Sequence, residues 1–185
     1  MTNTTWEELW DARIKGMEIT FGPHAPVVLH APIPFRIGQD LGGSPDVVLF
    51  TTFTKGTLYV TAELIGSEQP KNAMGNYELA IAHEGDERWG VNIICQLAYY
   101  TLHTVIEDGE TMDIGSATPD GSAIEAFLFR RIAQFDVLGK TANVICCVGI
   151  SGPELEYARE NGSQALIEQL GDSFLTTNLY RPSKI

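Results

Sequence analysis

The most constraining feature of this 185-residue chain is one apolar segment, Asn143 to Ile150, which is rich in β-branched and small hydrophobic residues. It does not alternate between polar and apolar positions, which is typical of a central strand covered on both faces. Its uninterrupted apolar part, Val144 to Ile150, is far shorter than the ~20 residues that a membrane crossing needs. The segment therefore predicts a sheet whose centre is buried on both sides.

Capping signals and hydrophobic periodicity place further elements around that strand. Thr4 and Thr5 are each followed three residues later by a glutamate, the pattern of a capping box at a helix start. Residues that recur every three or four positions, together with cap and breaker signals, predict helices over 5–20, 87–106, 151–161 and 163–170. Runs of β-branched and aromatic residues predict strands over 47–53, 58–62, 77–81, 111–114 and 126–130.

Residues 23–45 carry prolines at positions 23, 26, 32, 34 and 45, so this stretch is predicted as loop with one edge strand at Val27 to Leu29. No internal repeat divides the chain. We therefore predict a single domain over residues 1–185 of the α+β class, with one mixed, largely antiparallel β-sheet and helices packed against it.

The charge balance limits the classes of binding partner, and the cysteines indicate the cellular compartment. Acidic residues outnumber basic ones, 24 against 12, and the formal net charge is −12. A nucleic-acid partner or an anionic membrane surface requires a basic face, so both are disfavoured. The N-terminus lacks the regions of a secretory signal, and Cys95, Cys146 and Cys147 make a poor disulfide framework. We therefore expect a cytoplasmic protein with reduced, buried cysteines.

The residues show no recognisable catalytic or cofactor signature. None of the four histidines lies in a metal-binding spacing, and Gly38 to Gly43 lacks the ending of a phosphate loop. We therefore predict no catalytic residue, no cofactor and no metal site. The alternative is a small enzyme in which His83, Glu84 and His103 converge on one pocket, although a solvated loop histidine is the simpler interpretation of His83.

The negative charge is concentrated in the middle of the chain. Glu107, Asp108, Glu110 and Asp113 follow the predicted long helix with no basic residue among them. Runs of charge usually serve only to keep a surface solvated, and that interpretation stays open. The other interpretation is a negative face that steers a basic protein partner.

Several segments, taken in order along the chain, resemble the suppressor of fused family. They are Leu64 to Glu68, Asn76 to Ile81, Trp89 to Tyr100, Gly109 to Gly115 and Val148 to Ala158. The resemblance runs from about Val47 to Leu170. It rests on spacing and residue type rather than on a catalytic signature.

The resemblance implies a non-enzymatic α+β domain that binds a protein. Animal members restrain transcription factors of Hedgehog signalling, whereas this chain resembles the bacterial single-module form, many members of which look like immunity proteins that neutralise a cognate toxin. A basic toxin domain is therefore the expected partner, and a scaffold or oligomerisation module is a further alternative. The candidate partner-binding residues are Gly66, Ser67, Glu68, Glu107, Asp108, Glu110 and Asp113.

Overall fold

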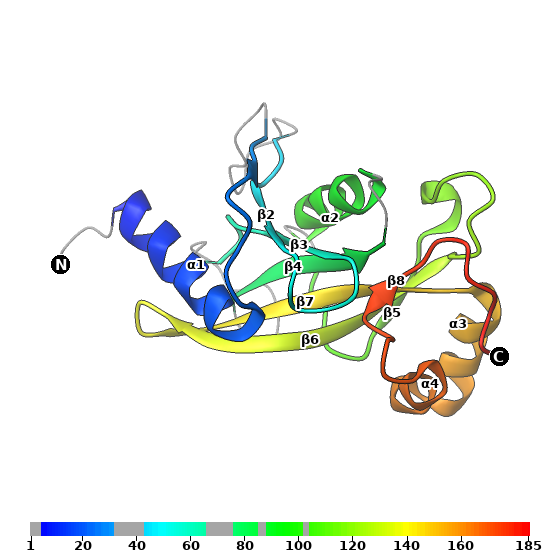
Figure 1. The fold of residues 1–185 in the computed structure, drawn as a ribbon. Helices are drawn as coiled ribbons and strands as arrows, with labels where there is room; N and C mark the ends of the chain where they lie inside the picture. The colour runs from blue at the N-terminus through cyan, green and yellow to red at the C-terminus, as the bar shows by residue number, and fades with distance from the viewer. Residues whose placement is uncertain (1–4, 32–42, 66–75, 85–87, 102–103) are drawn as a thin grey trace.

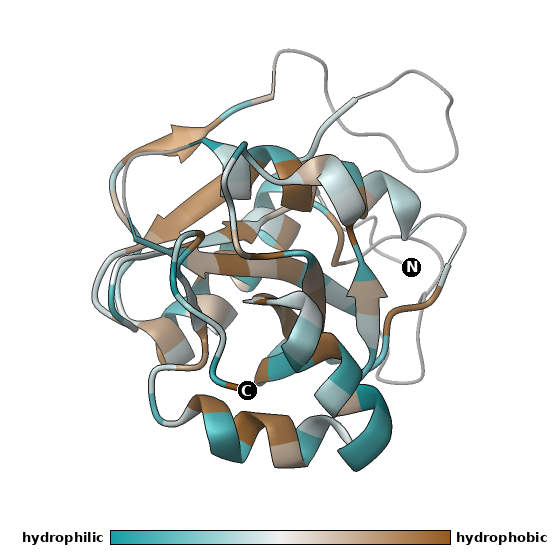
Figure 2. Cartoon of the chain, turned by 90° about the vertical axis from the view of Figure 1, so that its right-hand side faces the viewer, coloured by the Kyte–Doolittle hydropathy of each residue, from teal (hydrophilic) through white to brown (hydrophobic). Residues whose placement is uncertain are grey.

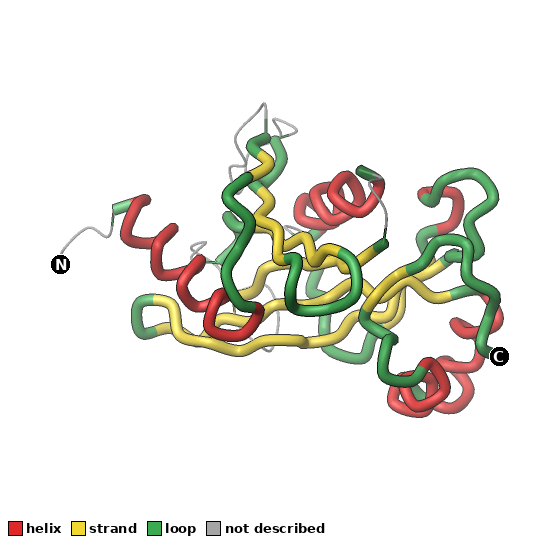
Figure 3. Tube along the Cα trace, in the orientation of Figure 1, coloured by secondary structure: helices red, strands yellow, loops and turns green. Residues whose placement is uncertain are grey.

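The computed structural model describes residues 5–31, 43–65, 76–84, 88–101 and 104–185. Its helices are α1 (Trp6–Phe21), α2 (Trp89–Tyr100), α3 (Gly152–Asn161) and α4 (Ser163–Leu170), with a 3-10 turn at Gly115–Ala117. Its strands are β1 (Val28–Leu29), β2 (Val47–Phe50), β3 (Thr57–Thr61), β4 (Asn76–His83), β5 (Thr111–Asp113), β6 (Ala126–Val137), β7 (Lys140–Ile150) and β8 (Thr176–Thr177). They form the predicted α+β domain around one mixed sheet (Figure 1, Figure 3).

The sheet consists of two antiparallel halves joined by one parallel pair. β1 to β4 follow one another in antiparallel order, and β7, β6 and β5 form the second antiparallel group. Between the halves β4 and β7 run parallel, with Ala80 opposite Cys146. At the end of β4 the short strand β8 continues the parallel pairing. We did not predict β8, because two residues are too few for a periodic signal.

Helices cover both faces of the sheet, and β4 and β7 are almost entirely buried as a result. α2 packs on the face that carries Leu79 and Ile145. On the opposite face α1 packs over Ala80 and Val144, while α3 and α4 pack over Cys146. Figure 2 shows apolar strands enclosed by helices of mixed hydropathy. β7 is therefore the covered central strand that its apolar run predicts.

β6 is much longer than the strand predicted over 126–130. The difference arises from a β-bulge, which interrupts the alternation of polar and apolar residues along the strand. The pairing with β7 shifts register between Arg131 and Ala133, which leaves Ile132 as the extra residue. The bulge moves Ala133 and Phe135 to the face covered by α1. An alternating pattern is lost at such a point, and the prediction therefore stops too early.

α2 ends at Tyr100, so the helix predicted to continue to residue 106 is wrong at this end. The hydroxyl of Thr101 donates to the carbonyl of Ala98 at 2.7 Å. The residues that follow include the β-branched Thr104, Val105 and Ile106, which lose side-chain freedom in a helix. The helical spacing of residues, on which the prediction rested, takes no account of this loss of side-chain freedom.

A buried ion pair fastens the C-terminal segment to the sheet. Glu154 is 0% exposed and accepts a hydrogen bond of 2.6 Å from each terminal nitrogen of Arg181. The same carboxylate accepts the backbone N–H of Lys184 and closes the capping box of α3 with Ser151. Burial acts to raise the pKa of Glu154, but these hydrogen bonds and the charge of Arg181 outweigh it and lower the pKa.

We expect Gly16→Ala to destabilise the domain, although alanine favours a helix by about 1 kcal/mol over glycine. Gly16 of α1 faces Phe135, and a Cβ atom at this position would lie 2.2 Å from Cδ2 of that ring. Urea unfolding should show a loss of roughly 1–3 kcal/mol from overpacking. The loss should shrink when Phe135→Ala is made in the same chain. An equal loss in both backgrounds would contradict the contact.

Candidate functional site

The acidic segment comprises the connection between α2 and β5 together with β5 itself, at the end of which Asp113 lies. Glu107, Asp108, Glu110 and Asp113 are all exposed. Two of these carboxylates make local hydrogen bonds, since Glu110 accepts the backbone N–H of Glu107 at 2.9 Å before β5 and Asp113 accepts that of Gly115 at 2.8 Å after it. The segment therefore presents its negative charges from a locally hydrogen-bonded backbone.

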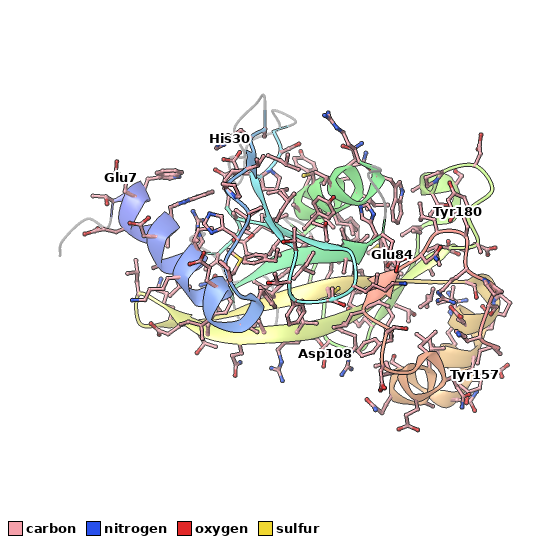
Figure 4. The ribbon with its side chains drawn as sticks, in the orientation of Figure 1. Glu7, His30, Glu84, Asp108, Tyr157 and Tyr180 are labelled. Atoms are coloured by element: carbon pink, nitrogen blue, oxygen red, sulfur yellow. The ribbon has the colours of Figure 1, made fainter. Side chains whose placement is uncertain are left out.

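β6 brings basic residues next to this segment, which the sequence order did not indicate. Oδ1 of Asp108 accepts the backbone N–H of Arg131 at 2.7 Å and lies 3.6 Å from Nη1 of Arg130. Figure 4 shows Asp108 at the edge of β6. Arg130 partly offsets the charge of Asp108, so Glu107, Glu110 and Asp113 carry most of the unbalanced negative charge of the segment.

A hollow of about 510 Å³ lies beside these acids, where the end of α2 faces β5 and the start of α4. Tyr100 and Val105 line it and are 43% and 45% exposed, and Glu110 forms part of the same lining. Large apolar side chains that stay exposed side by side at a hollow are candidates for partner contact. We call this surface the acidic corner and define it by Tyr100, Val105, Glu107, Glu110 and Asp113.

The other predicted contact residues, Gly66, Ser67 and Glu68, lie outside the described residues, but a buried carboxylate holds the chain that leads to them. Glu78 of β4 is 0% exposed. It accepts the backbone N–H groups of Leu64 and Ile65, both at 2.9 Å, and the hydroxyl of Thr61 at 2.6 Å. Ile65, directly before the predicted contact residues, is thereby fixed to the core.

Arg13 of α1 interacts electrostatically with this carboxylate and is 2% exposed. Its Nη1 donates to the carbonyl of Ile65 at 3.0 Å, and its guanidinium carbon lies 5.8 Å from the ring centre of Trp10. Burial raises the pKa of Glu78 to about 7, against the charge of Arg13 and the hydrogen bonds to the carboxylate, which lower it. Burial also lowers the pKa of Arg13. Burial therefore disfavours the charged form of both side chains.

Sequence reasoning missed this buried pair. Alternation along β4 assigns Glu78 to a solvent-facing side, whereas α1 covers that side. One signal was present, because Arg13 falls within a series of which Leu9, Trp10 and Met17 lie on the inner face of α1, although Trp6 of the same series is exposed. A charged residue on that face requires a buried partner of opposite charge.

Of the residues of the alternative enzyme interpretation, His83 and Glu84 are described, and their side chains are not paired with each other. His83 is 2% exposed, so the prediction of a solvated loop histidine is wrong. Its ring stacks on Tyr59 with the ring centres 5.0 Å apart, and its Nδ1 lies 3.3 Å from the carbonyl oxygen of Glu84. The carboxylate of Glu84, labelled in Figure 4, instead pairs with Lys55 at 2.5 Å. His103 lies outside the described residues.

Among the described residues, no group of three or more His, Cys, Asp or Glu side chains is arranged to hold a metal ion. No helix in the same ranges combines the length and the apolar character of a membrane-spanning segment.

The family to which this chain belongs follows from its match to a known protein family. The suppressor of fused protein family matches residues 32–182. This chain belongs to the suppressor of fused family. The match confirms the resemblance noted in the sequence and extends it on both sides of residues 47–170. A comparison with curated proteins finds no match.

Solved structures of suppressor of fused proteins share this fold. A chain of the Sufu–Fu complex crystal structure has a TM-score of 0.76 at 14% identity, over 95% of this chain and 92% of that chain. A suppressor of fused homolog from Neisseria gonorrhoeae has a TM-score of 0.67 at 12% identity, over 97% and 98% of the two chains. Drosophila Suppressor of Fused has a TM-score of 0.57 at 16% identity, over 78% of this chain but 40% of its own.

In this suppressor of fused domain, ionisation of Glu78 is expected to make stability depend on pH. Its folded pKa of about 7 lies above the ordinary value of 4.5. The folded state therefore binds the proton more tightly, so the contribution to stability is full below pH 4.5 and is lost as the pH rises through about 7.

Glu78→Gln should remove this dependence, because the amide keeps an acceptor oxygen but does not ionise. The free energy of unfolding of the original protein, relative to that of the variant, should fall by roughly 2–3 kcal/mol across this pH range in urea titrations. Glu7→Gln, at an exposed position, is the control and should leave the slope unchanged. If the free energy of unfolding depended on pH in the same way in the original protein and in Glu78→Gln, the assignment of this dependence to Glu78 would be contradicted.

Proposed function

We propose that this chain is a non-enzymatic protein-binding domain and that its acidic corner receives a basic protein. The observation that carries the proposal is that Glu110 lines one hollow together with exposed Tyr100 and Val105, while Glu107 and Asp113 are exposed nearby in the sequence. Protein interfaces commonly combine an apolar centre with a polar rim, and aromatic residues are enriched at their centres. The sign of the rim charge selects a partner of opposite sign and speeds its approach.

The family relationship supports a protein partner. The Sufu–Fu crystal structure is that of a complex of Sufu with Fu, and a chain of it shares the fold of this domain. The burial of His83 and the pairing of Glu84 with Lys55 also favour binding over catalysis, because a catalytic pocket needs polar groups that converge on a substrate.

More specifically, we infer an immunity role in which the partner is a toxin that cuts nucleic acid. Such a toxin needs a basic surface to hold a phosphate backbone. A domain of net charge −12 with Glu110 at an exposed apolar hollow is suited to occupy that surface in competition with the substrate. The resemblance to the bacterial single-module form supports the same role.

Neutralising two carboxylates of the acidic corner should slow association with the basic partner. The partner is first isolated from the lysate of the source cells at low salt, identified by mass spectrometry and purified. Glu107→Gln with Glu110→Gln should then reduce its association rate about three- to tenfold at low salt and flatten the salt dependence, because steering acts through the rim charges. The amides keep the acceptor oxygens of the connection, so the fold is retained.

The matched control is Glu7→Gln with Asp11→Asn, which removes the same charge from exposed positions on α1. Equal slowing by both double variants would show that only net charge matters and would overturn the acidic corner as the site. The immunity role has a separate test, since a purified toxin partner that keeps full nuclease activity at saturating domain concentration would exclude it.

A further inference from the structure

A second surface lies on the other side of α2. A hollow of about 790 Å³ is enclosed by β1 with its flanking residues, by the start of β2 and by one side of α2. Figure 1 shows α2 beside the end of the sheet at which β1 and β2 lie. We call this hollow the edge groove and define it by β1, Val91, Asn92, Cys95, Gln96 and Tyr99.

α2 presents two parallel rows of side chains to the edge groove. Asn92 and Gln96, which are exposed, form a polar row, and Val91, Cys95 and Tyr99, which are half-buried, form an apolar row. Residues four apart lie above one another on a helix, so each row runs along the groove. The side-chain amides of Asn92 and Gln96 make no hydrogen bond to another described residue. Two carboxamides in line are suited to pair with successive peptide groups of an extended chain.

The opposite wall of the groove is β1, the outermost strand of the sheet among the described residues. β1 pairs with β2 on one side only, and in the described part of the chain it is the first strand of the sheet. A strand at an edge directs part of its N–H and C=O groups outward, where an added strand can pair with them. The groove therefore offers a peptide backbone hydrogen bonds from the main chain of β1 and from the side-chain amides of α2, and apolar contacts from Val91 and Cys95.

The charge of the edge groove differs from that of the acidic corner. Among the described residues that line it there is no aspartate or glutamate, although the chain carries a net charge of −12. Its ionic side chains are Arg88 and His30, and His30 lies 2.6 Å from the nearby carboxylate of Asp46. A lysine or arginine placed in the groove would find no carboxylate in this lining, so the groove suits a segment without basic residues.

We propose that the edge groove binds an extended, apolar segment of a partner protein that contains no lysine or arginine. The peptide groups of the segment pair with β1 and with the carboxamides of Asn92 and Gln96, and its side chains pack on Val91 and Cys95. The proposal shares with the proposed function only the premise that the partner is a protein, because it concerns other residues and the opposite charge preference.

Selection from a displayed library of random linear peptides tests the groove without knowledge of the partner. Enriched peptides should be apolar, poor in lysine and arginine, and able to bind the isolated domain. Asn92→Ala with Gln96→Ala should weaken their affinity about tenfold or more, because two hydrogen bonds to the peptide are lost. Gln164→Ala with Gln169→Ala, at exposed positions of α4, is the matched control and should leave the affinity within about twofold.

Cys95 provides a reporter inside the groove. It is half-buried, whereas Cys146 and Cys147 are both 0% exposed, so alkylation of the folded domain reports on Cys95. Burial raises the pKa of Cys95 to about 11, and labelling is therefore carried out at alkaline pH. A saturating selected peptide should slow the alkylation at least tenfold.

The outcomes separate this proposal from its alternatives. Selection of lysine- or arginine-rich peptides, selection of none, or equal binding by both double variants would overturn it. A dimer in sedimentation that Asn92→Ala with Gln96→Ala dissociates would assign the groove to a second copy of this chain and would also overturn it. Glu107→Gln with Glu110→Gln should leave peptide affinity unchanged, so failure at the acidic corner and failure at the edge groove are distinguishable.

Discussion

The parallel pairing of β4 with β7 is the constraint on which the rest of this domain depends. Parallel strands cannot be joined by a tight turn, so the chain must cross from one half of the sheet to the other. It does so through α2, and it then builds β5 and β6 as the outer strands of the second half. Because α1 and α2 cover the pair on opposite faces, both strands need residues that tolerate burial on each side. Val144 to Ile150 meets that requirement almost without exception.

Glu78 is the exception on the partner strand, and its hydrogen bonds explain why it is there. It lies opposite Val144 in the parallel pair. Leu64 and Ile65 follow the end of β3 and are buried, so their N–H groups need an acceptor. A buried donor without a partner costs about 1–3 kcal/mol, and an apolar residue in place of Glu78 would leave both donors unpaired. The carboxylate therefore couples the centre of the sheet to the chain that enters the predicted contact residues 66–68.

The sequence predicted elements whose signals are local and missed those set by distant contacts. The capping box at Thr5 and the apolar run of β7 are encoded by neighbouring residues, and both are confirmed. The bulge at Ile132, the pairing of Asp108 with Arg130, and the burial of His83 depend on strands brought together only by folding. For the same reason the acidic residues of the candidate site were predicted, whereas exposed Tyr100 and Val105 beside them were not. Helical periodicity carried through residue 106 would have assigned both to one continuous helix.

α2 links the two proposed binding surfaces in one rigid element. Tyr99 lines the edge groove and Tyr100 lines the acidic corner, so the surfaces meet at the last turn of the helix. Their charge preferences differ, because one includes Glu107, Glu110 and Asp113 and the other has no carboxylate among its described lining residues. A partner that fills both must present a basic face next to an extended apolar segment free of basic residues. Contacts held at a fixed separation reinforce one another once the first is made, so neither surface alone needs high affinity. Specificity then follows from the combination, since a merely basic or merely apolar protein satisfies only one of the two surfaces.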